Sequence, residues 1–206
     1  MLLHICCGPC STHVAEVLSK NHEIVGYFYN PNIFPYEEWL KRYEAFKEVV
    51  ARGLVPRKTG KVEKLFIDYF PKKELTKEEW KTEHQKFLEA VKGLENEPEG
   101  GKRCLVCFKL RLEEAAKFAK KRKETQSPRE TESRYNFFST TLTIGRNKRA
   151  EIINPIGESA AKKYGVKFYA ADFKKQDGFL HSVKLSKEFG IYRQHYCGCE
   201  FFVNAD

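Results

Sequence analysis

Seven cysteines gather in three short motifs, and this spacing is the feature of the chain best suited to chemistry. The motifs are CCxxC, CxxC and CxC, formed by Cys6, Cys7 and Cys10, by Cys104 and Cys107, and by Cys197 and Cys199. A free cysteine is often only a small buried hydrophobe, but pairs and triples at ligand spacing are typical of metal or redox sites. The odd number excludes a fully paired disulfide framework.

The first two motifs contain enough thiols for a metal centre of four thiolates. Zinc and iron–sulfur clusters both accept such a ligand set, so residue type alone leaves both open. Structural zinc usually closes a small, loop-rich module. Here the thiols are expected at a strand-to-helix loop and at a helix N-terminus, where free N–H groups and the helix dipole stabilise anionic sulfur. This placement favours iron–sulfur.

The CxC motif needs a separate explanation. Cys197 and Cys199 are separated only by Gly198, so they could close a small strained disulfide of the labile kind that carries electrons. The alternative is that both are additional metal ligands.

The elements that must position the first motif follow from the hydrophobic pattern. Residues 2–5 are typical of a buried strand, and an amphipathic helix follows that Ser11 and Thr12 could cap. A second strand is predicted at 23–29, a helix at 36–52 ended by Gly53, and a short strand at 54–56. This alternation predicts an α/β, Rossmann-like doubly wound parallel sheet. Such sheets bind ligands at the carboxyl ends of their strands, where the first motif lies.

The second half of the chain is less regular. We interpret residues 62–103 as a helical insertion, residues 120–134 as a charged flexible loop, and residues 1–206 as one domain. A helix beginning near Cys104 would carry the CxxC motif at its N-terminus. Further elements are predicted as a strand at 135–144, a turn at Asn154 and Pro155, a helix at 157–164, a strand at 166–170 and a helix at 178–189.

Composition gives a class of partner. The 37 Lys and Arg against 28 Asp and Glu give a net charge of +9, which favours a polyanionic partner, although interleaved charges for solubility remain an alternative. No apolar run reaches the length of a membrane span, and the first 20 residues do not resemble a signal peptide. We therefore expect a cytoplasmic protein without a membrane partner.

Five motifs in order carry a resemblance over nearly the whole chain. They are LLHICCGPCS, RCLVCFKLRL, FFSTTLTIG, YAADFKKQDG and YRQHYCGC, and together they resemble the epoxyqueuosine reductase QueH family. The resemblance implies a Rossmann-like fold of the HUP (adenine nucleotide alpha hydrolase-like) type. It further implies a cobalamin-independent, iron–sulfur-dependent oxidoreductase that reduces epoxyqueuosine to queuosine at the anticodon wobble position of tRNA. It also implies that Cys6, Cys7, Cys104 and Cys107 hold a [4Fe–4S] cluster and that Cys197 and Cys199 are a redox-active disulfide. The partners would be the tRNA anticodon stem-loop carrying epoxyqueuosine and an unidentified electron donor.

Two residues of these motifs are left without a role. Cys10 belongs to the first motif, and Asp172 is expected at the carboxyl end of a late parallel strand. Our hypothesis is that both line the substrate side of the cluster and bind a second, mononuclear metal (iron) or the epoxide oxygen. The alternative for Asp172 is a turn cap.

Basic and aromatic residues around the motifs suit an RNA partner. Five of them flank the thiols and could contact phosphates, namely Arg103, Lys109, Arg111, Arg193 and His195. Aromatic side chains near the motifs, such as Tyr196, could stack on unpaired bases, although core packing explains most of them.

Two rival functions stay open. An ATP-dependent tRNA thiolase would share the α/β frame and the cysteines, but Pro9 removes an N–H that a phosphate-binding loop needs. A zinc-stabilised RNA-binding module would be colourless, whereas an iron–sulfur enzyme is brown.

Overall fold

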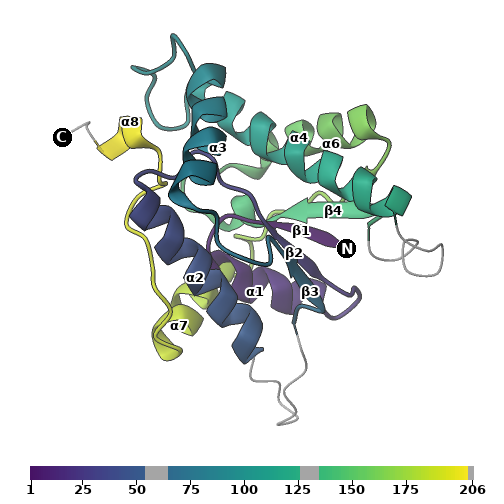
Figure 1. Cartoon of the computed structure of the whole chain (residues 1–206). Coiled ribbons are helices and arrows are strands. Elements are labelled where there is room, and N and C mark those ends of the chain that lie inside the picture. Colours follow the sequence, from purple (N-terminus) through teal and green to yellow (C-terminus); the bar gives the residue numbers. More distant parts are fainter. Residues whose placement is uncertain (54–64, 126–134, 204–206) are drawn as a thin grey trace.

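A five-stranded parallel sheet forms the centre of the computed structural model, which describes residues 1–53, 65–125 and 135–203 (Figure 1). The strands are β1 Leu2–Ile5, β2 Val25–Phe28, β3 Asp68–Phe70, β4 Phe137–Thr140 and β5 Lys167–Phe168. Their order is β3-β2-β1-β4-β5, and every neighbouring pair is parallel. The chain order reverses at β1, between β2 and β4. This arrangement confirms the α/β, Rossmann-like doubly wound prediction.

Helices cover both faces of the sheet. They are α1 Gly8–Leu18, α2 Tyr36–Arg52, α3 Lys77–Ala90, α4 Lys102–Thr125, the 3₁₀ helix η1 Thr141–Ile144, α6 Ala150–Tyr164, α7 Gly178–Glu188 and α8 Glu200–Val203. In Figure 1, α1, α2 and α7 lie on one side of the sheet and α4 and α6 lie on the other. β1 is buried between them: Leu3 and Ile5 pack in the cluster that includes α1 and α2, and Leu2 packs in the cluster that includes α4 and α6.

Helix α1 begins earlier than predicted. The expected caps Ser11 and Thr12 lie inside the helix, where their hydroxyls donate to the carbonyls of Gly8 and Pro9. Instead Cys7 is the N-cap, and its sulfur accepts the backbone N–H of Cys10. Pro9 suits this start because the first turn of a helix does not use its N–H groups internally.

The segment predicted as a helical insertion is only partly helical. It contributes the edge strand β3 as well as α3, which begins with a capping box between Thr76 and Glu79. The strand predicted at 54–56 lies outside the described residues.

Three other boundaries were wrong. Helix α4 continues to Thr125, so the first part of the predicted 120–134 loop is helical, because Lys, Arg and Glu are good helix formers; residues 126–134 lie outside the described part. Helix α6 passes through the turn predicted at Asn154 and Pro155, and Pro155 is exposed to solvent within it. The strand predicted at 135–144 is shorter because the chain coils into η1 after Thr140.

No helix in the described ranges is both long and apolar enough to cross a membrane.

Candidate metal and redox site

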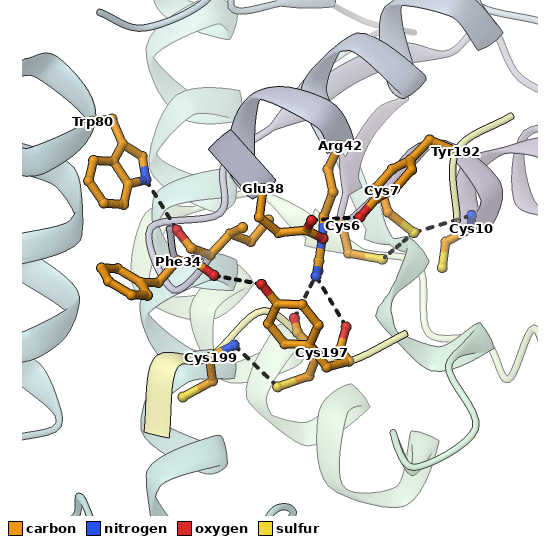
Figure 2. A network of polar contacts seen from close by, with 12 residues as sticks. Cys6, Cys7, Cys10, Phe34, Glu38, Arg42, Trp80, Tyr192, Cys197 and Cys199 are labelled. Atoms are coloured by element: carbon orange, nitrogen blue, oxygen red, sulfur yellow. Dashed lines mark hydrogen bonds and ion pairs between the residues drawn. The ribbon is translucent and has the colours of Figure 1, made fainter. Parts of the chain in front are cut away.

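The three thiols of the first motif lie together at the carboxyl end of the central strand. Cys6 and Cys7 follow β1 directly, and Cys10 lies in the first turn of α1. Their three Sγ atoms lie within 4.8 Å of one another, and those of Cys6 and Cys7 are 3.8 Å apart (Figure 2). The strand end and the helix start therefore bring the trio into a geometry that a metal ion or cluster could use, as the sequence predicted.

Thr141 joins this trio to the neighbouring strand. Its hydroxyl oxygen accepts the backbone N–H of Cys6 at 3.0 Å and lies 3.2 Å from the Cys6 sulfur, to which it can donate. Thr141 opens η1 directly after β4, the strand next to β1. The Thr141 hydroxyl thus holds Cys6 in place from the end of the neighbouring strand β4, at the point where the strand order reverses.

The three thiols differ in how easily they lose a proton. Hydrogen bonds from Cys10 and Cys7, with the nearby charges of Lys148 and Arg111, hold the pKa of Cys6 well below its usual range. Burial raises the pKa of Cys7 to about 12. Hydrogen bonding to Cys6 raises that of Cys10. Hydrogen bonds among the thiols and the nearby cations therefore favour a negative charge within the trio.

The CxxC thiols occupy the first two turns of α4. The backbone N–H of Gly100 donates to the Cys104 sulfur at 3.2 Å, and Cys107 is buried. Burial raises the pKa of both thiols. The N-terminal position on α4 confirms the sequence prediction for this pair.

The CxC thiols lie on a C-terminal strap, defined as residues 191–199 between α7 and α8. Cys199 N–H donates to the Cys197 sulfur at 3.4 Å, and all seven cysteines of the chain are free thiols in the structure. A hydrogen bond from Cys199 lowers the pKa of Cys197 to about 6. Gly198 between them has a φ of +99°, a conformation that favours glycine.

Arg42 of α2 holds this strap in place. Its guanidinium donates to the backbone carbonyls of Cys197 at 3.0 Å and Tyr196 at 3.1 Å, and its Nε donates to Glu38 at 2.6 Å (Figure 2). Tyr192 donates its hydroxyl to the other Glu38 oxygen at 2.6 Å. Arg42 is 2% exposed, so this is a buried and fully engaged cation.

A backbone contact and a tyrosine fix the strap from the other side. The N–H of Phe34 donates to the carbonyl of Gly198 at 2.9 Å, and the hydroxyl of Tyr196 donates to the carbonyl of Phe34 at 2.7 Å. The strap is thus bonded to the segment between β2 and α2 as well as to α2 itself.

Two adjoining cavities bring the three motifs together. Cys6, Cys10 and Cys197 line a larger one of about 410 Å³. A smaller one is lined by both CxxC and both CxC thiols. The two share five lining residues, which are Glu99, Arg111, Asn147, Lys148 and Cys197. The three cysteine motifs, which are far apart in sequence, therefore meet around the two cations Arg111 and Lys148.

The predicted basic residues are divided by the structure. Arg111, Arg193 and His195 line the larger cavity. Arg111 also donates to the Asn30 side chain, whose amide donates to the carbonyl of Ile5 at 2.9 Å. Arg103 instead lies over the Phe201 ring and lines the smaller cavity, and Lys109 is exposed outside both linings.

Asp172 is not brought to the thiols. It follows β5, the edge strand two places from β1, and its carboxylate accepts the N–H of Lys174 at 3.2 Å. It lines neither of the two cavities. These contacts match the alternative of a turn cap.

Sequence reasoning missed Arg42, Glu38 and Lys148. The first two are charged residues at i, i+4 on a helix face that is otherwise apolar, and such a buried pair is an available signal. Lys148 lies outside every motif, and only the fold brings it to Cys6 and Cys197.

The chain is similar to one known family, both by its family profile and by comparison with individual proteins. The profile of the family described as epoxyqueuosine reductase QueH matches residues 1–205. The chain is 37% identical over 202 residues to the protein of that name from Streptococcus pyogenes serotype M1, covering 98% of this chain and 69% of that one. It is 37% identical to the Staphylococcus epidermidis protein, covering 98% and 75%, and 35% identical to the Thermotoga maritima protein, covering 98% and 88%, both of the same name.

Proposed function

The chain belongs to the epoxyqueuosine reductase QueH family and is therefore an oxidoreductase, and we propose that it reduces epoxyqueuosine to queuosine in tRNA as an iron–sulfur enzyme without cobalamin. The observation that carries the proposal is the meeting of all three cysteine motifs around two adjoining cavities that share Arg111 and Lys148. The modified base would be at the anticodon wobble position.

Cys6, Cys7, Cys104 and Cys107 would hold a [4Fe–4S] cluster. The residues fit this group in chemistry: all four are free thiols, two follow a buried strand and two begin a helix whose N-terminus favours anionic sulfur. Arg111 influences both Cys6 and Cys107 through its charge, so a cation is available to both pairs. When bound, such a cluster supplies electrons one at a time.

Cys197 and Cys199 would supply the electron pair. Reduction of an epoxide to an alkene consumes two electrons and two protons and releases the oxygen as water. Oxidation of two thiols to one disulfide releases two electrons and two protons, so the two half-reactions balance. An external electron donor would then reduce the disulfide back to the dithiol.

The substrate would enter the larger cavity. Its volume of about 410 Å³ is in the range of small-ligand sites, and Arg146, Lys148 and Arg193 supply positive charge in its lining. Phe179 and Tyr196 offer aromatic surface there, which suits a base turned out of its strand. Phosphate contacts to these cations would make tRNA binding weaken steeply with added salt.

Cys10 takes the substrate side of the trio in this proposal. It lines the larger cavity with Cys6, so it could hold a second metal ion or meet the epoxide oxygen. Asp172 is not part of this proposal, because it lines neither cavity and its carboxylate accepts a backbone N–H in the turn after β5.

The test is anaerobic purification of the wild type and a matched set of Cys→Ser variants, with iron, sulfide and zinc measured per chain and epoxide loss followed in the reduced protein. Cys104→Ser should lose iron and turnover together. Cys197→Ser should keep its iron and lose turnover. A colourless protein holding zinc in place of iron would contradict the proposal. Equal loss of iron in both variants would make the CxC pair ligands instead of a redox couple.

A further inference from the structure

A second group of metal-ligating side chains lies outside the thiol cavities, between α1 and α7. It consists of His13 and Glu16, which are three residues apart on α1, and His181 on α7. The two helices pack side by side below the sheet in Figure 1. One ligand atom from each residue lies within 4.8 Å of the other two.

The three ligand atoms are close enough together to surround one cation. His13 Nδ1 is 3.7 Å and His181 Nε2 is 3.3 Å from Glu16 Oε2. Hydrogen bonds of this type are shorter, about 2.7–3.2 Å. Zn–N and Zn–O bonds of about 2.0–2.2 Å place neighbouring ligands of a tetrahedral ion about 3.3–3.6 Å apart, so the His181 distance falls in this range and the His13 distance lies just above it.

Two of the three ligand atoms have no hydrogen bond within the described part of the chain, and their contacts at 3.7 and 3.3 Å are ion pairs only when a histidine is protonated. His13 Nδ1 and Glu16 Oε2 are buried and have no hydrogen-bond partner among the described residues. A buried polar atom without a partner is costly, and a bound cation would satisfy both atoms at once.

The surroundings hold the ligands in place and leave a route for the ion. A Cβ at Gly178 would lie 2.8 Å from His13 Nε2, so this glycine lets the start of α7 approach the imidazole closely. Burial lowers the pKa of His13, and a lower pKa favours the neutral ring that metal binding requires. The His181 side chain is 44% exposed, so solvent reaches the third ligand.

We propose that His13, Glu16 and His181 form a binding site for a divalent transition ion, zinc in the first instance, with the fourth position open to water. Two imidazoles and one carboxylate are a ligand set that zinc accepts. The ion would cross-link α1 and α7. Because α1 carries Cys10 and α7 carries Phe179 and Ser182 of the larger cavity, it would fix one wall of that cavity.

The test compares zinc binding by the full chain, prepared anaerobically with its cysteine-held iron, at one free zinc concentration. The variants are Glu16→Gln and His181→Ala. The matched control is His22→Ala, because the His22 ring packs edge-on against Tyr169 and is not one of the three ligands. Wild type and His22→Ala should bind about one zinc per chain more than the two variants, with unchanged iron. X-ray absorption of that zinc should show nitrogen and oxygen ligands and no sulfur.

Equal zinc in all four proteins, or a zinc held only by sulfur, would overturn the proposal. The readout does not depend on the reductase reaction. If the protein failed to reduce the epoxide while the zinc difference persisted, the proposed function would fail and this site would stand.

Discussion

The thiols near the two ends of the chain are held in different ways. Cys6 directly follows the central strand β1, and Cys7 caps helix α1. Both thiols are therefore positioned by elements that any fold of this type must form. Cys197 and Cys199 lie on a strap without regular structure, positioned by one buried guanidinium and a few contacts to the segment before α2. The position of the first group therefore depends on the sheet, whereas that of the second depends on a few contacts to Arg42 and Phe34.

The largest effect is expected from Arg42→Ala. It leaves Glu38 buried without its cation and removes two hydrogen bonds to the strap, so the free energy of unfolding should fall by about 3–5 kcal/mol. Chemical denaturation measures this loss. Alkylation of Cys197 in metal-free, still folded protein should become faster while that of Cys7 does not change. Equal acceleration at both thiols would contradict the statement that Cys7 and Cys197 are positioned in different ways.

A smaller effect is expected from Gly198→Ala. The side chain would be forced into a left-handed conformation and its Cβ would lie 2.9 Å from Arg42 Nη1, which should cost about 1–3 kcal/mol and displace the CxC thiols. Gly190→Ala is the matched control, because Gly190 also has a positive φ but open space around it. The rate of epoxide reduction should fall only in Gly198→Ala. Equal activity in the two variants would contradict the proposal that the strap positions the CxC thiols.

Thr141→Val addresses the thiols at the other end. Losing the hydroxyl leaves the Cys6 N–H without its acceptor and should cost about 1–2 kcal/mol of stability in urea titration. Thr143→Val is the control, since the Thr143 hydroxyl is buried with no hydrogen-bond partner among the described residues and its removal should cost less. Iron content should fall only in Thr141→Val. The same loss from both variants would show that Thr141 has no special tie to Cys6.

The smallest effect is expected from Tyr192→Phe. Glu38 keeps its bond to Arg42, so only one hydrogen bond is lost, worth about 0.5–1.5 kcal/mol. The thermal midpoint should fall slightly and iron content should not change. A fall in iron would mean that the strap supports the cluster directly.

The same contrast explains what the sequence could predict. The strand–thiol–helix unit, the helix 36–52 and the N-terminal place of the CxxC pair follow from local periodicity and stop signals, and the structure has them. The start of α1 was misplaced because a cysteine acts as its cap, which is an unusual capping residue.

The parts that could not be predicted depend on contacts between distant segments. Nothing in the pattern around Arg42 or Lys148 indicates that each meets a cysteine loop more than 40 residues away in sequence. For Asp172 the local motif suggested a place in the site. In the fold it follows the edge strand β5, and its carboxylate accepts a backbone N–H in a turn.

The central claim is that the chain reduces the epoxide of epoxyqueuosine in tRNA with its cysteine-held centre. The most direct measurement is incubation of the anaerobically prepared, reduced protein with tRNA carrying epoxyqueuosine, followed by digestion and mass spectrometry of the wobble nucleoside. The wild type should remove one oxygen atom and form queuosine, and Cys197→Ser with its iron intact should form none. An iron-loaded, folded wild type that leaves the epoxide unchanged would contradict it.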